Sequence, residues 1–154
     1  MFRYFAYGSA LSVARTREWC DSHGMDIAPF LAGVPARLDD HELQFRVPSR
    51  YWQGLVADLV PRAGGVVHGV LFALADDARE AVLHKEGVVT GLFREVVVEV
   101  LAGDRRVSAS SFSAEPARVT AAGAPSATYL DALITGGEER NLPAAWLATL
   151  RGFR

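Results

Sequence analysis

Tyr4-Phe5-Ala6-Tyr7-Gly8-Ser9-Ala10-Leu11, near the start of the 154-residue sequence, combine a strand pattern with an abrupt turn. From Phe2 to Tyr7 the residues are mostly large and alternate between two faces, as in a β-strand. Gly8 can adopt backbone angles that other residues avoid, and Ser9 can cap a following helix. We therefore predict a tight strand-to-helix turn whose free backbone N–H groups can hold a carboxylate or an oxyanion. The alternative, that Gly-Ser merely ends a strand, stays open because the motif is short.

Composition and charge limit the kind of protein that this sequence encodes. Half of the residues are hydrophobic, which is enough for the core of a single domain over residues 1–154. The net charge of −2 gives no general attraction to polyanions, so we expect neither nucleic acid nor a membrane as a partner. No apolar run approaches the ~18 residues of a membrane span, and the first residues do not form a signal peptide.

Cysteine and histidine give no indication of a metal site. Cys20 is the only cysteine, so we expect no disulfide within the chain and no cysteine-based metal centre. The spacing of the four histidines does not match that of metal ligands, although His84 lies beside an acidic residue. We therefore expect a cytoplasmic protein without a metal centre. Its oligomeric state stays open.

Alternation, helical spacing and turn residues predict the remaining elements. A Pro-Arg-Ala-Gly-Gly sequence at 61–65 indicates a hairpin turn between two strands. Asp76 and Asp77 fit the cap and first turn of a short helix, and Gly136-Gly137 fits the end of a later one. Strands are expected at 27–38, 41–47, 55–60, 66–74, 92–101 and 106–112, and helices at 11–22, 78–85, 126–135 and from about Pro143 onward.

Three further positions carry side chains that binding sites use. The loop at 48–54 contains Tyr51 and Trp52, which can stack on a flat ligand or serve packing alone. Glu86 precedes Gly87 at the end of a predicted helix, where a carboxylate meets the negative pole of the helix dipole. Tyr129 falls among the apolar positions of a later predicted helix. From these residues alone, Glu86 can be a surface acid and Tyr129 an ordinary core residue.

Taken together and in order, four blocks of the sequence resemble the γ-glutamylcyclotransferase-like family, which includes the AIG2-type proteins. The resemblance implies an α+β fold, a small mixed β-barrel with flanking helices. It also implies a pocket between the Tyr-Gly-Ser loop and an acidic residue. The four blocks are residues 4–11, residues 52–74 with Trp-Gln-Gly and Val-His-Gly-Val-Leu-Phe, Glu86-Gly87-Val88 with the strand after it, and Tyr129 through Asn141-Leu142-Pro143.

The resemblance further implies a reaction that needs no cofactor. A γ-glutamyl amino acid or γ-glutamyl amine can cyclise to 5-oxoproline when its own α-amine attacks the γ-carbonyl, releasing the attached amine. Glu86 matches the family's general acid/base, so it is the expected catalytic residue. The alternative is a non-catalytic small-molecule binding or regulatory module that uses the same pocket. The expected substrate-binding residues are Tyr4, Phe5, Ala6, Tyr7, Gly8, Ser9 and Tyr129.

Two positions depart from the family pattern. The motif commonly continues with asparagine after Tyr-Gly-Ser, and here that position is Ala10. Seven residues after Glu86, some members have a tyrosine, whereas this chain has Phe93. Both changes remove hydrogen-bonding groups from the expected pocket, so they put the substrate in doubt more than the fold. They also leave open the possibility that catalysis has been lost.

Overall fold

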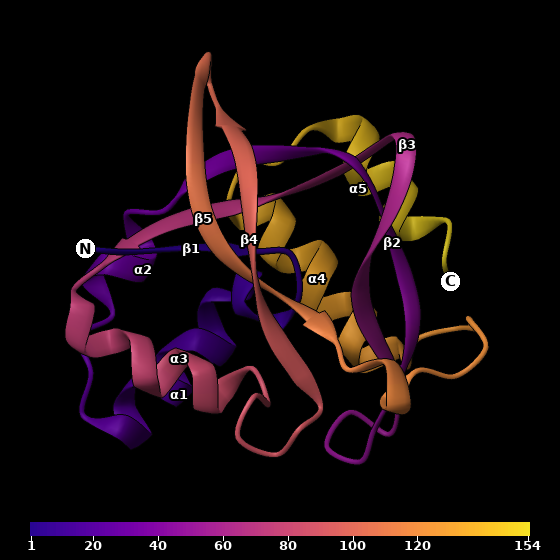
Figure 1. Ribbon diagram of the computed structural model, residues 1–154, viewed down its shortest axis with the longest axis horizontal. Coiled ribbons are helices and arrows are strands. Elements are labelled where there is room, and N and C mark those ends of the chain that lie inside the picture. The colour runs from indigo at the N-terminus through magenta and orange to yellow at the C-terminus, as the bar shows by residue number, and fades with distance from the viewer.

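Five strands form a closed barrel in the computed structural model, which describes residues 1–154 (Figure 1). Their order around the barrel is β1-β3-β2-β4-β5. The first and last of these pair in parallel, and the other pairs are antiparallel, so the predicted mixed barrel is confirmed. The strands are β1 (Phe2–Ala6), β2 (Val34–Ser49), β3 (Gly54–Leu74), β4 (Phe93–Ala102) and β5 (Arg105–Ala114).

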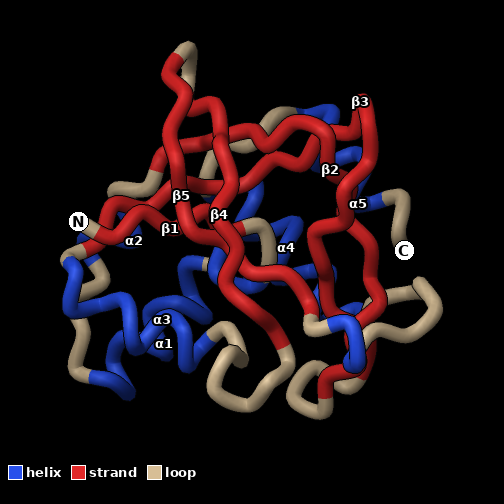
Figure 2. The backbone as a smooth tube through the Cα atoms, viewed as in Figure 1, coloured by secondary structure: helices blue, strands red, loops and turns tan.

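Helices surround the barrel, as Figure 2 shows. Two of them, α1 and α3, approach each other where Lys85 of α3 lies over the Trp19 ring of α1. Two others, α4 and α5, pack together on another side of the barrel. No helix is both long and apolar enough to cross a membrane. The helices are α1 (Val13–His23), α2 (Ala28–Leu31), α3 (Arg79–Lys85), α4 (Ala127–Glu139) and α5 (Ala144–Arg151), with short 3₁₀ turns η1 (Ser9–Leu11), η2 (Asp76–Ala78) and η3 (Pro116–Arg118).

The predicted hairpin turn at 61–65 is wrong, because β3 runs through this segment without reversing. It stays paired with β2 on both sides, with Pro61 opposite His41 and Val66 opposite Asp39. Between these two pairs the chain advances by five residues in β3 and by only two in β2. The extra residues of β3 therefore form a bulge. The Asp40 carboxylate accepts a hydrogen bond from the N–H of Gly64 at 3.0 Å. The turn residues thus bend a long hairpin instead of closing a short one.

The predicted strand at 27–38 is also wrong in its first half. Residues 28–31 form the short helix α2, with a proline in its first turn, and β2 begins only at Val34. The Asp26 carboxylate accepts a hydrogen bond from the N–H of Ala28 at 2.9 Å, which holds the start of this turn. From Val34 the strand continues to Ser49, so the two expected strands at 27–38 and 41–47 are replaced by one.

Several predicted helix ends differ from the structure. Ser12, and not Ser9, caps α1 by accepting a hydrogen bond from the N–H of Arg15 at 3.2 Å. The expected cap at Asp76 is not formed, because Ala75 occupies the cap position of η2 and no side chain bonds there, whereas Asp77 lies in the first turn as expected. Gly24, in the left-handed conformation, caps the end of α1, and Ser126 caps the start of α4.

Gly136-Gly137 does not end α4, which continues to Glu139. A Cβ at Gly136 would lie 2.4 Å from the carbonyl carbon of Leu11, so the missing side chain lets α4 touch the backbone after the opening turn. Arg140 strengthens this contact, because its Nε donates to the Leu11 carbonyl oxygen at 3.2 Å. The glycine pair therefore serves packing, and it places α4 directly against η1.

The core of the barrel is apolar, with one buried acid. Asp58 of β3 is fully buried and bridges three strands. Its Oδ2 accepts from Nε of Arg46 at 2.7 Å, and its Oδ1 accepts from the N–H of Ala114 at 2.8 Å. These hydrogen bonds compensate the buried negative charge of Asp58 and fix β3 against β2 and β5. The fully buried large side chains include Phe5, Phe30, Phe45, Phe72 and Phe112.

Candidate active site

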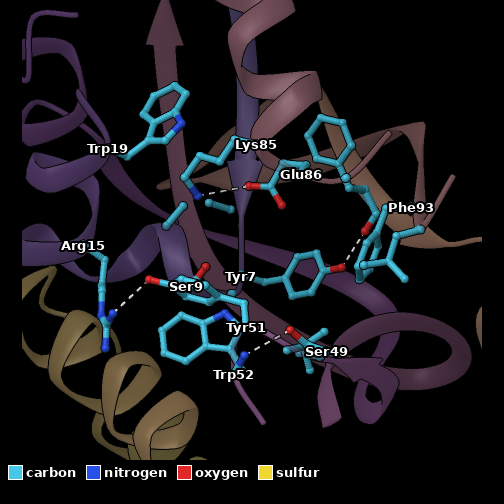
Figure 3. A pocket seen from close by; sticks show the side chains of 18 of the residues that line it. Tyr7, Ser9, Arg15, Trp19, Ser49, Tyr51, Trp52, Lys85, Glu86 and Phe93 are labelled. Atoms are coloured by element: carbon cyan, nitrogen blue, oxygen red, sulfur yellow. Dashed lines mark hydrogen bonds and ion pairs between the residues drawn. The ribbon is translucent and has the colours of Figure 1, made fainter. Parts of the chain in front are cut away.

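A pocket of about 690 Å³ opens beside the turn that follows β1 (Figure 3). Its walls come from β1, η1, α1, the loop between β2 and β3, α3 and α4. The eight residues expected from the sequence therefore meet in one place, although they come from three separate segments. Tyr4, Phe5, Ala6, Tyr7, Gly8, Ser9, Glu86 and Tyr129 all line this pocket, and their roles stay predictions.

The turn after β1 leaves consecutive backbone donors without partners. The N–H groups of residues 7–10 take part in none of the protein's hydrogen bonds, whereas those of Leu11 and Ser12 donate to the carbonyl groups of Gly8 and Ser9. Ala6 lies in the β1 ladder opposite Val70, so the free donors begin one residue later. Successive free N–H groups are able to bind a negatively charged oxygen.

Gly8 lies at the centre of this turn with a φ of −110°, so its backbone does not require the left-handed region. The neighbouring side chain instead leaves little room for a larger residue. A Cβ at this position would lie 3.2 Å from the hydroxyl oxygen of Tyr129 on α4. The predicted reason for Gly8, an unusual backbone angle, is therefore replaced by close contact with another residue of the pocket.

Glu86 extends into the pocket from the end of α3. The helix stops at Lys85, and the backbone N–H of Glu86 still donates to the Val82 carbonyl at 2.9 Å. Gly87 then reverses the chain with a φ of +78°. The Tyr4 hydroxyl donates a short hydrogen bond to Oε1 of Glu86, and the ammonium of Lys85 lies 3.5 Å from the same oxygen. Oε2 has no protein partner, and the side chain is 24% exposed, so a ligand can reach this carboxylate.

Three buried tyrosines surround the carboxylate and the turn. Burial raises the pKa of Tyr4 well above its ordinary value, and the charge and hydrogen bond of Glu86 raise it further. Burial likewise raises the pKa of Tyr7, with a smaller contribution from the charge of Asp58. The pKa of Tyr129 is also raised, mainly by burial. All three hydroxyls therefore keep their protons at neutral pH and act as neutral hydrogen-bonding groups.

Tyr7 and Tyr129 use their hydroxyls differently. Tyr7 donates to the carbonyl oxygen of Phe112 at 2.5 Å, which ties the end of β1 to β5. The Tyr129 hydroxyl accepts from the N–H of Ala57 at 3.1 Å and donates to no protein group. Its own hydrogen is therefore free for a ligand beside Gly8.

The mouth of the pocket contains Arg15, which sequence reasoning did not place there, beside the aromatic loop that it had singled out. The guanidinium of Arg15 lies 4.7 Å from the centre of the Trp52 ring and donates to the Tyr51 hydroxyl at 3.1 Å. Trp52 in turn packs edge-on against Tyr129, with ring centres 5.1 Å apart. The loop at 48–54 thus packs against the site and also lines the pocket. The adjacent aromatic pair was the only sequence signal for this wall.

Lys85 was also missed, although two sequence signals were available. It is the only lysine of the chain, and it directly precedes Glu86. Its side chain is 15% exposed, and its ammonium lies 5.8 Å from the centre of the Trp19 ring. Ala10 and Phe93, the two departures from the family pattern, also line the pocket. No group of three or more histidine, cysteine or acidic side chains is arranged to hold a metal ion.

Comparison with known proteins gives one family and several solved structures. Residues 66–150 match the AIG2-like family. A solved structure described as a gamma-glutamyl cyclotransferase has a TM-score of 0.85 and 24% identity, covering 99% of this chain and 88% of that chain. YkqA from Bacillus subtilis has a TM-score of 0.84 and 26% identity, covering 98% of this chain and 53% of that chain. A yeast gamma-glutamyl cyclotransferase specific to glutathione has a TM-score of 0.61 and 14% identity, covering 99% of this chain and 96% of that chain. No curated protein sequence gives a significant match.

The family match covers more than half of the chain and includes Glu86 and Tyr129. It does not include the turn at residues 7–10, whose N–H groups are unpaired. The likeness to the solved cyclotransferases, at 24% and 14% identity, shows a shared fold. The protein is therefore a member of the AIG2-like family, and its closed barrel with flanking helices is the fold of the γ-glutamyl cyclotransferases.

Proposed function

We propose that this protein is a cofactor-independent γ-glutamyl cyclotransferase. One observation carries the proposal: residues 7–10, whose N–H groups are unpaired, and Glu86, whose carboxylate is accessible, line the same pocket. Donors for a negatively charged oxygen and a group that moves protons are the two requirements of this reaction. The shared fold with gamma-glutamyl cyclotransferases supports the same assignment.

In the proposed reaction the substrate attacks itself. Glu86 takes a proton from the α-ammonium group, and the free amine then forms a bond to the γ-carbonyl carbon. The carbonyl oxygen gains negative charge, which the free N–H groups of the turn stabilise. The amide C–N bond then breaks as Glu86 returns the proton to the leaving nitrogen. The attacking nitrogen still carries a second proton, which Glu86 removes and passes to the released amine. The products are 5-oxoproline and the amine as its ammonium ion, so no water is consumed and Glu86 ends unchanged.

The pocket's contribution is to fold the substrate and to exchange protons. Holding the amine against the carbonyl can correspond to an effective concentration of about 10⁵ M or more. A positioned carboxylate contributes on the order of 10²- to 10⁴-fold. The Tyr129 hydroxyl, with its hydrogen unused by the protein, can donate to the substrate carboxylate beside Gly8. Tyr4 holds Oε1 of Glu86, which leaves Oε2 for the proton transfers.

The second candidate function is a non-catalytic binding or regulatory module. It is favoured by Ala10 and Phe93, which both line the pocket and lack the polar groups common at these positions. Such a protein would use the same turn and the same tyrosines to bind γ-glutamyl compounds, but it would release them unchanged.

The experiment that separates the two functions uses a panel of γ-glutamyl dipeptides and γ-glutamyl amines. The purified protein is incubated with each compound, and 5-oxoproline is measured by mass spectrometry. A parallel reaction contains EDTA, because the proposed chemistry does not use a metal. Formation of 5-oxoproline in both reactions supports the enzyme. Binding by calorimetry without any 5-oxoproline supports the binding module, and loss of turnover in EDTA that one divalent ion restores would refute the cofactor-independent mechanism.

A further inference from the structure

Arg15 is the only arginine that lines the pocket, and its guanidinium has no carboxylate partner. It belongs to the first turns of α1, directly after the segment with the free N–H groups. None of the protein's ion pairs involves it. Glu18 lies one turn further along the same helix and also lines the pocket, but it forms no ion pair with Arg15. A cation in a pocket without its own counter-charge is available to a negatively charged ligand.

The guanidinium is held in place by neutral groups. One of its nitrogen atoms, Nη1, donates to the Tyr51 hydroxyl at 3.1 Å, and its plane lies over the Trp52 ring at 4.7 Å. An arginine has five N–H donors in a planar fork, so the contact with Tyr51 leaves donors that can bind both oxygens of a carboxylate. Because the side chain is already held, binding such a group loses less conformational entropy.

Lys85, the other cation of the pocket, is not equivalent. Its ammonium lies 3.5 Å from the Glu86 carboxylate, and its side chain is only 15% exposed. The charge of Lys85 is therefore already paired with Glu86, the group that would perform the proton transfers. The histidines of the pocket wall, His23 and His84, lie on the α1 and α3 side, where Lys85 approaches Trp19.

The position of Arg15 indicates which part of a substrate it would meet. Figure 3 shows Glu86 with Lys85 at one side of the pocket, and Arg15 with Trp52 at the opposite side. In a γ-glutamyl compound the α-amine and the scissile amide must both reach Glu86, so the γ-glutamyl part lies near the carboxylate and the turn. The substituent on the leaving amine points away from these groups, towards the mouth where Tyr51 is 73% exposed.

We propose that Arg15 is a specificity-determining residue that binds a carboxylate on the leaving amine. The protein then prefers γ-glutamyl amino acids over γ-glutamyl amines that lack a carboxylate. This inference rests on the proposed cyclotransferase function, and it adds a role for a residue outside the turn and outside Glu86.

The test uses pairs of substrates that differ only in this carboxylate. One pair is γ-glutamyl-alanine and γ-glutamyl-ethylamine, and the other is γ-glutamyl-phenylalanine and γ-glutamyl-phenethylamine. The release of 5-oxoproline gives kcat and KM for the parent, Arg15→Gln and Arg15→Lys. The matched control is Arg17→Gln, which removes an exposed arginine of the same helix that does not line the pocket.

We expect the parent to prefer the carboxylate member of each pair. Arg15→Gln should raise KM for that member at least about tenfold, because a charge-assisted hydrogen bond is lost. The amine member should be nearly unaffected, and Arg15→Lys should restore part of the preference because it keeps the charge without the fork. Arg17→Gln should behave like the parent. Thermal unfolding checks that each variant is folded.

Other outcomes would overturn the inference. An equal rise in KM for both members of a pair would mean that Arg15 contacts the γ-glutamyl part of the substrate or supports the turn. No change in KM for either member would mean that Arg15 does not contribute to substrate binding. If the parent turns over none of the compounds, the proposed function fails, and calorimetry on the same pairs then decides the role of Arg15. A binding preference for the carboxylate member that Arg15→Gln removes would support that role, and the absence of such a preference would refute it.

Discussion

The hydroxyl of Tyr4 donates a hydrogen bond to Oε1 of Glu86, which lies 82 residues later in the sequence. Strand β1 thus fixes the carboxylate that ends α3. The Tyr4 ring is buried and packs against Phe72 and Phe112, with ring centres 5.7 Å away in each case. Since the ring is held by packing and its pKa is raised, the hydroxyl is a fixed donor over the neutral pH range.

Tyr4→Phe should reduce catalysis more than stability. The variant keeps the buried ring and removes only the hydroxyl, so the orientation of Glu86 is lost while the packing remains. A hydrogen bond to a charged group contributes about 1.5–3 kcal/mol, so we expect kcat/KM to fall roughly tenfold or more. Thermal unfolding should change little by comparison. Unchanged kinetics in a folded variant would show that Glu86 needs no support from Tyr4.

Glu86→Gln tests the proton transfer itself. The amide keeps the shape of the side chain and can still accept from Tyr4, but it cannot act as a base. Turnover should fall at least ~10²-fold, while affinity for a γ-glutamyl compound changes much less. The thermal midpoint should stay similar or rise, because a carboxylate at the end of α3 meets the negative pole of the helix dipole.

A matched control for Glu86→Gln is Glu18→Gln, which removes another carboxylate of the same pocket wall. Glu18 makes no hydrogen bond to Tyr4, so its removal should leave most of the turnover. If Glu86→Gln cyclises its substrate at nearly the parent rate, Glu86 is not the base.

Gly8→Val should weaken ligand binding. Its Cβ would lie 3.2 Å from the Tyr129 hydroxyl, and its methyl groups would extend beyond the Cβ and occupy space beside this hydroxyl. Overpacking of this kind typically costs about 1–3 kcal/mol, so the thermal midpoint should also fall. Calorimetry with γ-glutamyl-alanine, on the Glu86→Gln background to prevent turnover, measures the affinity. Gly8→Ala is the milder comparison, and a folded Gly8→Val variant with parent affinity would mean that the turn is only a connector.

His68 should make the protein less stable as the pH falls. Burial and the charge of Arg37 lower its pKa from the ordinary value of 6.5, and the opposing effect of Asp39 is smaller. The unfolded chain therefore binds a proton more readily than the folded protein does, so stability decreases as the pH falls through 6.5 towards the folded pKa. The ring lies 5.7 Å from that of Trp146, which packs β3 against α5.

The measurement is urea unfolding of the parent and of His68→Gln, between about pH 7.5 and pH 5.5. The free energy of unfolding should fall less steeply with decreasing pH in the variant. An identical pH dependence in both proteins would assign the effect to other groups.

The sequence predicts the barrel well and its long hairpin poorly. The four blocks of family resemblance extend over most of the chain, so the architecture follows from them. Local signals failed at 61–65, where proline and glycine are typical of a reversal. The chain does not reverse there because β2 stays paired on both sides of the bulge, and only the partner strand determines this.

The site could be predicted as a set of residues but not as an arrangement. Glu86 and the turn were named from sequence, and the structure brings them into one pocket. The bond between Tyr4 and Glu86 was not foreseen, because nothing in either local segment specifies a contact across 82 residues. Arg15 was missed for a related reason, since a long side chain on a helix can face solvent or a pocket depending on how that helix packs.

The contact of Gly136 with the Leu11 backbone has a consequence for the order in which the site is made. The residues of the turn are synthesised before Tyr129 and Gly136 of α4, with more than 100 residues between them. A growing chain that lacks α4 also lacks the surface on which η1 rests and the hydroxyl beside Gly8. The pocket therefore assembles only after α4 has been synthesised, and a nascent chain that lacks α4 has no complete pocket.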